Sequence, residues 1–149
     1  MKFICDSMLG NLAKHLRILG LDTISIENPD RLEPFTNNAD PPFFFTKRIK
    51  KFPYRSTVFI RSDTIEEQLE EIQHITQPYI DPEIFLKRCV ECNSLLKSVV
   101  KEDIEALVPE YVYHHHEHFK RCLTCNKIYW EGTHTKAMKK WVEHIRTLK

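Results

Sequence analysis

Two hydrophobic periods follow each other over the first part of the chain and predict an α/β fold. Residues 2–5 form a short apolar run that ends at Asp6, which is typical of a buried strand. Over residues 8–19 the apolar positions recur with the spacing of an amphipathic helix, and Gly20 follows as a C-terminal cap. Residues 21–26 alternate and are β-branched, which predicts a second strand. A strand–helix–strand unit of about 25 residues implies a parallel pair with a right-handed crossover.

The pattern continues more weakly towards residue 76. In order, we expect a short helix within residues 31–39, strands over 43–46 and 57–60, and a helix over 65–75 that starts after Asp63 or Thr64 as cap. The result is an α/β layered domain with a parallel sheet, which we place at residues 1–80. The segment 77–82 holds two prolines and is interpreted as a linker. Residues 81–149 then form a second, smaller module.

Four cysteines in two CxxC pairs dominate this second module. The pairs share the pattern C-x-x-C-N and are separated by 29 residues; the four thiols are Cys89, Cys92, Cys122 and Cys125. Two such turns facing each other supply four thiolates in a tetrahedron, the set that Zn²⁺ prefers. Because four sulfur ligands leave the ion no open position, we expect a structural zinc ion rather than a catalytic one. Redox chemistry of the CxxC pairs and an iron–sulfur centre are the alternatives.

Further groups in the small module have less specific patterns. Phe119, Ile128, Tyr129 and Trp130 are expected to form its core. Histidines at 114–116, 118 and 134 surround Glu117 and could bind a second metal, although an exposed His-rich loop is the simpler interpretation. Asn93 and Asn126 each follow a CxxC pair, where Asn tolerates the left-handed backbone that such turns often need.

Composition and charge narrow the classes of protein. Hydrophobic residues make up 42% of the 149 residues and the net charge is +1, which is typical of a globular domain and argues against a non-specific polyanion binder. No apolar run approaches the roughly 20 residues that cross a bilayer, and the N-terminus does not resemble a secretion signal. We therefore expect a cytoplasmic protein with no membrane partner. Cys5, the fifth cysteine, is expected to be an ordinary buried thiol.

Acidic residues follow three of the predicted strands. Asp6, Asp30 and Asp63 come after the first, second and fourth strands, and Glu27 lies closest to the end of the second. Ligands of open α/β sheets gather beyond the carboxyl ends of the strands, and clustered carboxylates bind Mg²⁺ or Mn²⁺. Such a site could activate water for phosphodiester hydrolysis. The alternative is that these acids only cap helices.

A basic segment lies next to these acids in the sequence. Residues 47–55 hold five basic residues and no acid, and the residues that could contact nucleic-acid phosphates are Lys47, Arg48, Lys50 and Lys51. Phe52 and Tyr54 lie between them and could stack on bases. A solvated loop without a ligand would show the same composition.

The two ends of the chain resemble the Mut7-C RNase domain family. The resemblance is carried by residues 3–20, beginning Phe3-Ile4-Cys5-Asp6, by shorter matches at 21–23, 68–69, 88–89, 92–96, 108–109 and 119–125, and by residues 127–134. It implies a PIN-like fold with a C-terminal zinc ribbon and a metal-dependent ribonuclease that acts on RNA.

The resemblance also implies roles for single residues. Asp6 matches the first acid of the family's pattern and Asp30 matches the second. Where the family has Thr-Arg-Asp after an apolar strand, this chain has Thr46-Lys47-Arg48, so a base replaces the third acid. A positive charge there disfavours a cation. Two alternatives to an active enzyme follow: a module that binds RNA or protein without catalysis, and a zinc-ribbon adaptor.

Overall fold

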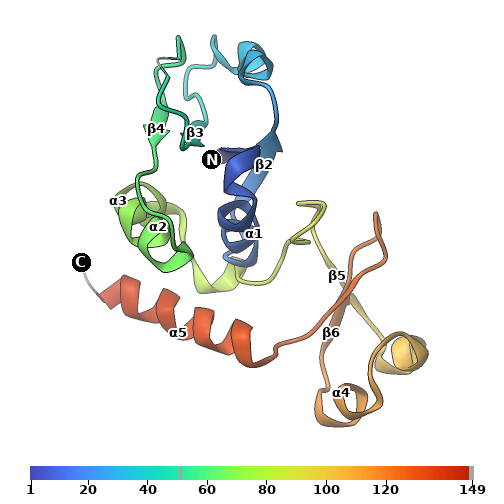
Figure 1. The fold of residues 1–149 in the computed structure, drawn as a ribbon. Helices are drawn as coiled ribbons and strands as arrows, with labels where there is room; N and C mark the ends of the chain where they lie inside the picture. The colour runs from blue at the N-terminus through green and yellow to red at the C-terminus, as the bar shows by residue number, and fades with distance from the viewer. Residues whose placement is uncertain (51, 148–149) are drawn as a thin grey trace.

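The first half of the molecule is built on a parallel four-stranded sheet. We analysed a computed structural model that describes residues 1–50 and 52–147, without the side chains of 134 and 145–147. The strands are β1 (Lys2–Asp6), β2 (Asp22–Ile26), β3 (Phe43–Thr46) and β4 (Thr57–Phe59). They lie in the order β2-β1-β3-β4, with every neighbouring pair parallel (Figure 1). The parallel α/β sheet predicted from the sequence is confirmed.

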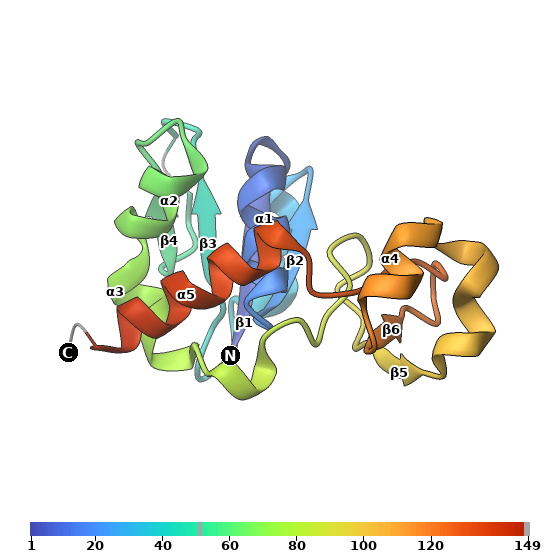
Figure 2. The ribbon, with the colours of Figure 1, turned by 90° about the horizontal axis from the view of Figure 1, so that it is seen from below.

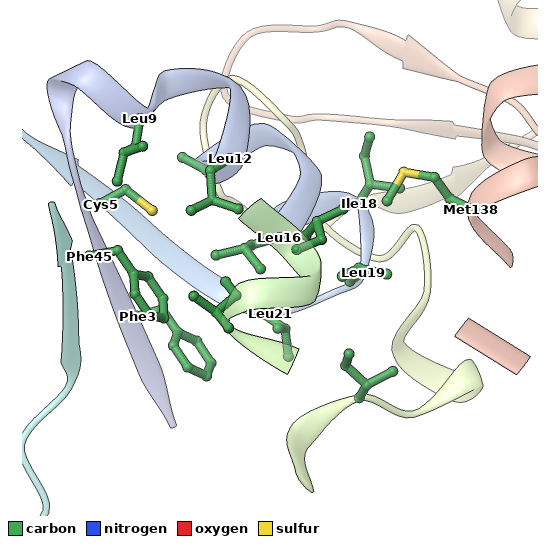
Figure 3. Packing of buried hydrophobic residues seen from close by; sticks show 14 of the residues in the cluster. Phe3, Cys5, Leu9, Leu12, Leu16, Ile18, Leu19, Leu21, Phe45 and Met138 are labelled. Atoms are coloured by element: carbon green, nitrogen blue, oxygen red, sulfur yellow. The ribbon is translucent and has the colours of Figure 1, made fainter. Parts of the chain in front are cut away.

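One face of the sheet is covered by helices. These are α1 (Gly10–Ile18), which follows the 3₁₀ turn η1 (Ser7–Leu9), and the pair α2 (Ile65–Glu71) and α3 (Gln73–Thr76). Side chains at alternate positions of β1 and β3 meet the apolar face of α1 (Figure 3). Cys5 is fully buried there, and burial raises the pKa of its thiol to about 12, which makes it the unreactive core cysteine that we expected.

The opposite face is covered by irregular chain. The 3₁₀ helix η2 (Pro29–Phe35) contributes Leu32, and the loop between β3 and β4 contributes Phe52 and Tyr54. All three side chains pack in one cluster with Ile4 and Phe44 of the sheet. Phe52 and Tyr54 are 9% and 4% exposed, so the suggestion that they stack on bases is wrong.

The second half contains a small antiparallel sheet. Its strands are β5 (Lys97–Val99), β6 (Phe119–Arg121) and β7 (Ile128–Tyr129), paired in that order. The 3₁₀ helix η5 (Lys101–Leu107) and α4 (Glu110–His115) connect β5 to β6. The core of this half is formed by Ile104, Val112, Phe119 and Ile128, with Trp130 packed against it. Tyr129 lies instead beside the cysteines.

The proline-containing segment between the halves is ordered and packed. It forms two short 3₁₀ helices, η3 (Gln77–Tyr79) and η4 (Pro82–Ile84), and Ile80, Phe85 and Leu86 are buried in the core of the first half. Gly20 lies directly against the backbone of Ile84 and has φ +87°. The junction after α1 therefore depends on a residue without a side chain.

The last helix returns to the first half of the molecule. Helix α5 (Thr133–Thr147) leaves the small sheet and runs along the helical face of the parallel sheet (Figure 2). Met138 and Val142 are buried in the same cluster as Phe3 and Leu16, and Met138 lies near Ile18 in Figure 3. No helix over these residues was predicted from the sequence. The core of the parallel-sheet half therefore includes residues from beyond position 81.

The first cysteine pair is docked on the free edge of the parallel sheet. Asn93, in the left-handed conformation with φ 62°, accepts a hydrogen bond from the Thr23 N–H at 3.0 Å and donates one to Asp22 Oδ1 at 2.7 Å. Arg17 donates to the Thr23 carbonyl at 2.9 Å and to the Val90 carbonyl at 2.6 Å. Backbone groups of the edge strand thus find partners on both α1 and the cysteine loop.

The contact between Gly20 and Ile84 generates the first prediction. A Cβ atom on Gly20 would lie 1.9 Å from the Ile84 carbonyl oxygen, and the positive φ adds strain of its own. Gly20→Ala is expected to lower the free energy of unfolding by about 2 kcal/mol or more. Gly10→Ala is the matched control, because a Cβ there meets nothing within 4 Å. Urea denaturation of both variants checks this; equal stabilities would contradict the close contact.

The contact of Asn93 with strand β2 generates the second prediction. Asn93→Gly keeps the left-handed backbone but leaves the buried Thr23 N–H without its partner, so we expect a loss of about 1–3 kcal/mol in the free energy of unfolding. Asn126→Gly is the control, since Asn126 has the same conformation with φ 65° and is exposed. A similar loss in both variants would show that the side-chain contact to β2 contributes nothing.

Candidate functional sites

The four cysteines meet at one point between the two CxxC loops. Their sulfur atoms all lie within 4.8 Å of one another, and none forms a disulfide. The Cys89 and Cys125 sulfurs are 3.7 Å apart. A regular tetrahedron with Zn–S distances of about 2.3 Å has S···S edges of about 3.8 Å. The donor set therefore fits a tetrahedral metal ion such as Zn²⁺, and the small antiparallel sheet that carries it is consistent with a zinc ribbon.

The loops around the cysteines are shaped for sulfur ligands. Asn93 and Asn126 both adopt positive φ, as expected from the repeated pattern. The Cys92 N–H points at Cys89 Sγ at 3.4 Å. Tyr129 Oη lies 3.1 Å from the same sulfur and accepts the Val90 N–H at 3.0 Å. Burial, and then the hydrogen bond to Cys89, raise the pKa of the Tyr129 phenol.

Crowding of the thiols separates their pKa values. Hydrogen bonding to Cys125, followed by burial, raises the pKa of Cys92 to about 12. Burial also acts to raise the pKa of Cys122, but the backbone N–H groups of Cys125 and Thr124 outweigh it and lower that pKa to about 7. Four thiolates so close together repel one another, and a cation among them removes this repulsion.

The histidine-rich segment does not form a second centre of this kind. His114 contacts Glu110 at 3.8 Å, and His115 Nδ1 lies 2.6 Å from the Tyr111 carbonyl. Within residues 1–50 and 52–147, the four cysteines are the group of three or more His, Cys, Asp or Glu found close enough to share an ion. The side chain of His134 lies outside the described residues.

Asp6 occupies the point where the strand order reverses. The chain passes from β1 to β2 on one side of β1 and then to β3 on the other side. Ligands of such sheets bind between the carboxyl ends of the two strands at which the order reverses, here β1 and β3. Asp6 ends β1 and Thr46 ends β3, and Thr46 Oγ1 donates to Asp6 Oδ2 at 2.8 Å. The candidate site at this crevice is therefore built on one buried carboxylate.

The Asp6 carboxylate is already occupied by groups of the chain itself. Oδ2 accepts a hydrogen bond from Thr46 and forms an ion pair with Arg48, whose Nε lies 2.9 Å away. Oδ1 accepts from Ser7 Oγ at 3.3 Å and from the Met8 N–H at 3.4 Å. Its side chain is 2% exposed. A carboxylate offers about four lone-pair positions, and here three hydrogen-bond donors and the Arg48 guanidinium surround it. The arginine therefore takes the place in which a metal ion would contact Asp6, while Asp6 also caps η1.

Asp63 is paired with the other base of the same loop. Lys47 Nζ lies 2.6 Å from Asp63 Oδ1 and 2.9 Å from the Ser62 carbonyl. The Asp63 side chain is 90% exposed, and the hydrogen bond and charge of Lys47 lower the pKa of its carboxyl. Asp63 does not cap the next helix, because Thr64 does so by accepting the Glu67 N–H.

The remaining predicted residues lie around this edge. Asp30 is exposed in the first turn of η2, with its N–H bonded to Asn28. Glu27 gives its carbonyl to Arg48 Nη2 at 3.3 Å. Lys50 is exposed, and Lys51 lies outside the described residues. In the part of the chain that the structure describes, Asp6, Asp30 and Asp63 do not come close enough to form a three-carboxylate group.

Sequence reasoning missed two residues of this edge. Thr46 orients both members of the ion pair, because its hydroxyl donates to Asp6 and accepts the Arg48 N–H at 3.1 Å. Phe59 ends β4 in register with Thr46 and remains 47% exposed. A hydroxyl residue at the end of a predicted strand, and an aromatic one at the end of its neighbour, were the signals available.

Comparison with known proteins identifies the family. Within the described residues, every helix is too short or too polar to cross a bilayer. Neither the curated proteins nor the solved structures gave a significant match. The model of the Mut7-C RNase domain matches residues 1–142, which takes in the parallel sheet, the four cysteines and most of α5. The chain belongs to the Mut7-C RNase domain family.

Proposed function

We propose that this chain binds RNA at the carboxyl edge of its parallel sheet, with Arg48 in place of a metal ion at Asp6. The buried ion pair between Asp6 and Arg48 is the observation that carries the proposal. A metal ligated by Asp6 would have to displace a guanidinium that is held at Nε by Asp6 and at Nη2 by the Glu27 carbonyl. Mg²⁺ or Mn²⁺ gives up its own waters reluctantly, so this exchange is unfavourable.

The same arrangement suits a phosphate group. Arg48 uses one of its five N–H donors on the Glu27 carbonyl and forms an ion pair with Asp6, and its side chain is 35% exposed. The remaining donors and the neighbouring Lys47, Lys50 and Lys51 can contact a phosphodiester backbone. Contacts to two to four phosphates predict that log K for single-stranded RNA falls with log salt at a slope of about −1.5 to −3.

Metal-dependent cleavage is the second candidate, because family membership and the buried acid at the strand end both favour it. In this version Asp6, Asp30 and Asp63 hold Mg²⁺ or Mn²⁺, which supplies an activated water for hydrolysis of the phosphodiester. This candidate requires two changes in the structure. Arg48 has to move away from Asp6, and the carboxylates of Asp30 and Asp63 have to move towards Asp6. Lys47 and Arg48 would then hold the phosphate.

Restoring an acid at position 48 separates the two candidates. Arg48→Asp removes the competing cation and places a second carboxylate beside Asp6, so we expect Mn²⁺-dependent cleavage of labelled single-stranded RNA that the unmodified protein lacks. The double variant Asp6→Asn/Arg48→Asp is the control and should be inactive. The unmodified protein should retain the RNA without cutting it.

Two outcomes would contradict this. Cleavage by the unmodified protein that Asp6→Asn abolishes would establish the metal-dependent enzyme instead. Failure to retain RNA at low salt would exclude RNA as the ligand and favour an adaptor that binds protein through the small module.

We also infer that the four cysteines hold a structural zinc ion. The sulfur atoms meet in tetrahedral spacing, Cys89 and Cys122 are fully buried, and no position is left open for substrate. The ion would join two loops whose hydrophobic core is small. Redox activity and an iron–sulfur centre remain the alternatives for the same four thiols.

Metal removal tests this assignment. Elemental analysis should find about one zinc and no iron per chain, and chelation should abolish the near-UV signal and protease resistance of residues 87–132, since the ion contributes to folding. Cys122→Ser should have the same effect, whereas Cys5→Ser is the control for a cysteine outside the cluster. Retained structure after complete chelation would show that the thiols need no ion.

A further inference from the structure

We propose that the groove beyond the end of β4 binds one nucleobase of single-stranded RNA, stacked on Phe59. The inference rests on the proposed RNA binding and adds a subsite to it. The groove has a volume of about 890 Å³ and is lined by side chains of the loop after β3 and of the loop after β4. This volume is within the range of small-ligand sites, which is roughly 300–1,000 Å³.

Phe59 supplies an aromatic surface that the fold leaves uncovered. Of the aromatic side chains between residues 43 and 59, those of Phe44, Phe45, Phe52 and Tyr54 are buried in the cores and that of Phe43 packs partly against one. Phe59 is 47% exposed at the end of the edge strand, and Ile49 across the groove is fully exposed. Stacking of a base on an exposed ring contributes about 1–3 kcal/mol and accepts any base.

The charges around the groove match a nucleotide rather than an apolar partner. Lys47, Lys50 and Arg61 line it together with one acid, Asp63. Because Lys47 neutralises Asp63 at 2.6 Å, Lys50 and Arg61 are the other cations that line the groove. The Lys50 ammonium lies 5.9 Å from the centre of the Phe52 ring, and the charge of Arg61 also acts on Glu71. An apolar floor bordered by cations is the arrangement with which proteins bind single-stranded nucleic acid.

The groove also lies next to the site at Asp6 through the pairing of β3 with β4. Phe59 is the registered neighbour of Thr46, whose hydroxyl bonds both Asp6 and Arg48. Registered residues on neighbouring parallel strands point to the same side of a sheet. A base on Phe59 therefore places an adjoining phosphate near Arg48, and one RNA strand can occupy both subsites.

Substitution of Phe59 tests the subsite. In fluorescence anisotropy with single-stranded RNA of about 12 nucleotides, Phe59→Ala should weaken binding roughly 5- to 100-fold, and Phe59→Tyr should restore it. The slope of log K against log salt concentration should stay unchanged in the Phe59→Ala variant. In the Arg61→Ala variant the magnitude of this slope should fall by about 0.7. Tyr111→Ala, at another exposed aromatic residue on α4, is the matched control and should have no effect.

A spectroscopic signal separates stacking from general effects. The fluorescence of RNA that carries 2-aminopurine should be quenched by the unmodified protein and by the Phe59→Tyr variant, and not by the Phe59→Leu variant. RNA binding that is equal in Phe59→Ala and the unmodified protein, with equal quenching, would overturn this subsite and leave RNA binding intact. Self-association that depends on Phe59, without an effect on RNA, would overturn it in favour of a second copy of the chain. Absence of RNA binding at any salt concentration would overturn both proposals.

Discussion

The free edge of strand β2 is the constraint on which the arrangement of the whole molecule depends. An edge strand exposes backbone N–H and C=O groups that pair with other chains unless something covers them. Here Asn93 and Arg17 satisfy Thr23, and Arg17 also holds the Val90 carbonyl in the first cysteine loop. Arg88 completes the contact by donating to the carbonyls of Gly20 and Asn93. The four-cysteine half is therefore part of the packing of the parallel sheet.

At the opposite end of the strands, charge decides what the fold can do. The crevice of a parallel sheet collects ligands, and a buried acid there attracts a cation. In this chain the cation is the side chain of Arg48, which pairs with Asp6. Arg48 lies two residues after the end of β3, the strand beside β1. Thr46 fixes the geometry of the pair through its single hydroxyl. The charge of the buried acid at this sheet edge is thus balanced within the chain.

Local patterns were enough to predict the elements but not their partners. The strand at 43–46, the helix after Asp6, the cap at Thr64 and the left-handed asparagines all follow from residue spacing, and the structure has them. The cysteine cluster was equally readable, because two identical loops leave few other arrangements.

Long-range packing was not readable in the same way. Phe52 and Tyr54 lie in a basic segment and were interpreted as exposed, yet together with the 3₁₀ helix η2 they cover the sheet face opposite the α-helices. Helix α5 was missed although Met138, Trp141 and Val142 have helical spacing. Its apolar face packs on a cluster that is assembled from residues between 3 and 86, which no local pattern specifies. Lys47 pairs with Asp63, and Arg48 pairs with Asp6. These ion pairs depend on the directions of the side chains, which residue spacing does not predict.

The return of α5 has a consequence for the order in which the chain can fold. Met138 and Val142 belong to the buried cluster of the helical face, where Met138 lies near Ile18 and covers apolar surface (Figure 3). During synthesis the sheet and its first helices emerge early, with this apolar surface exposed until residue 142 has been made. Contacts between residues so distant in sequence also close slowly. The nascent chain is thus exposed to aggregation for most of its translation, and the late arrival of α5 ends that period.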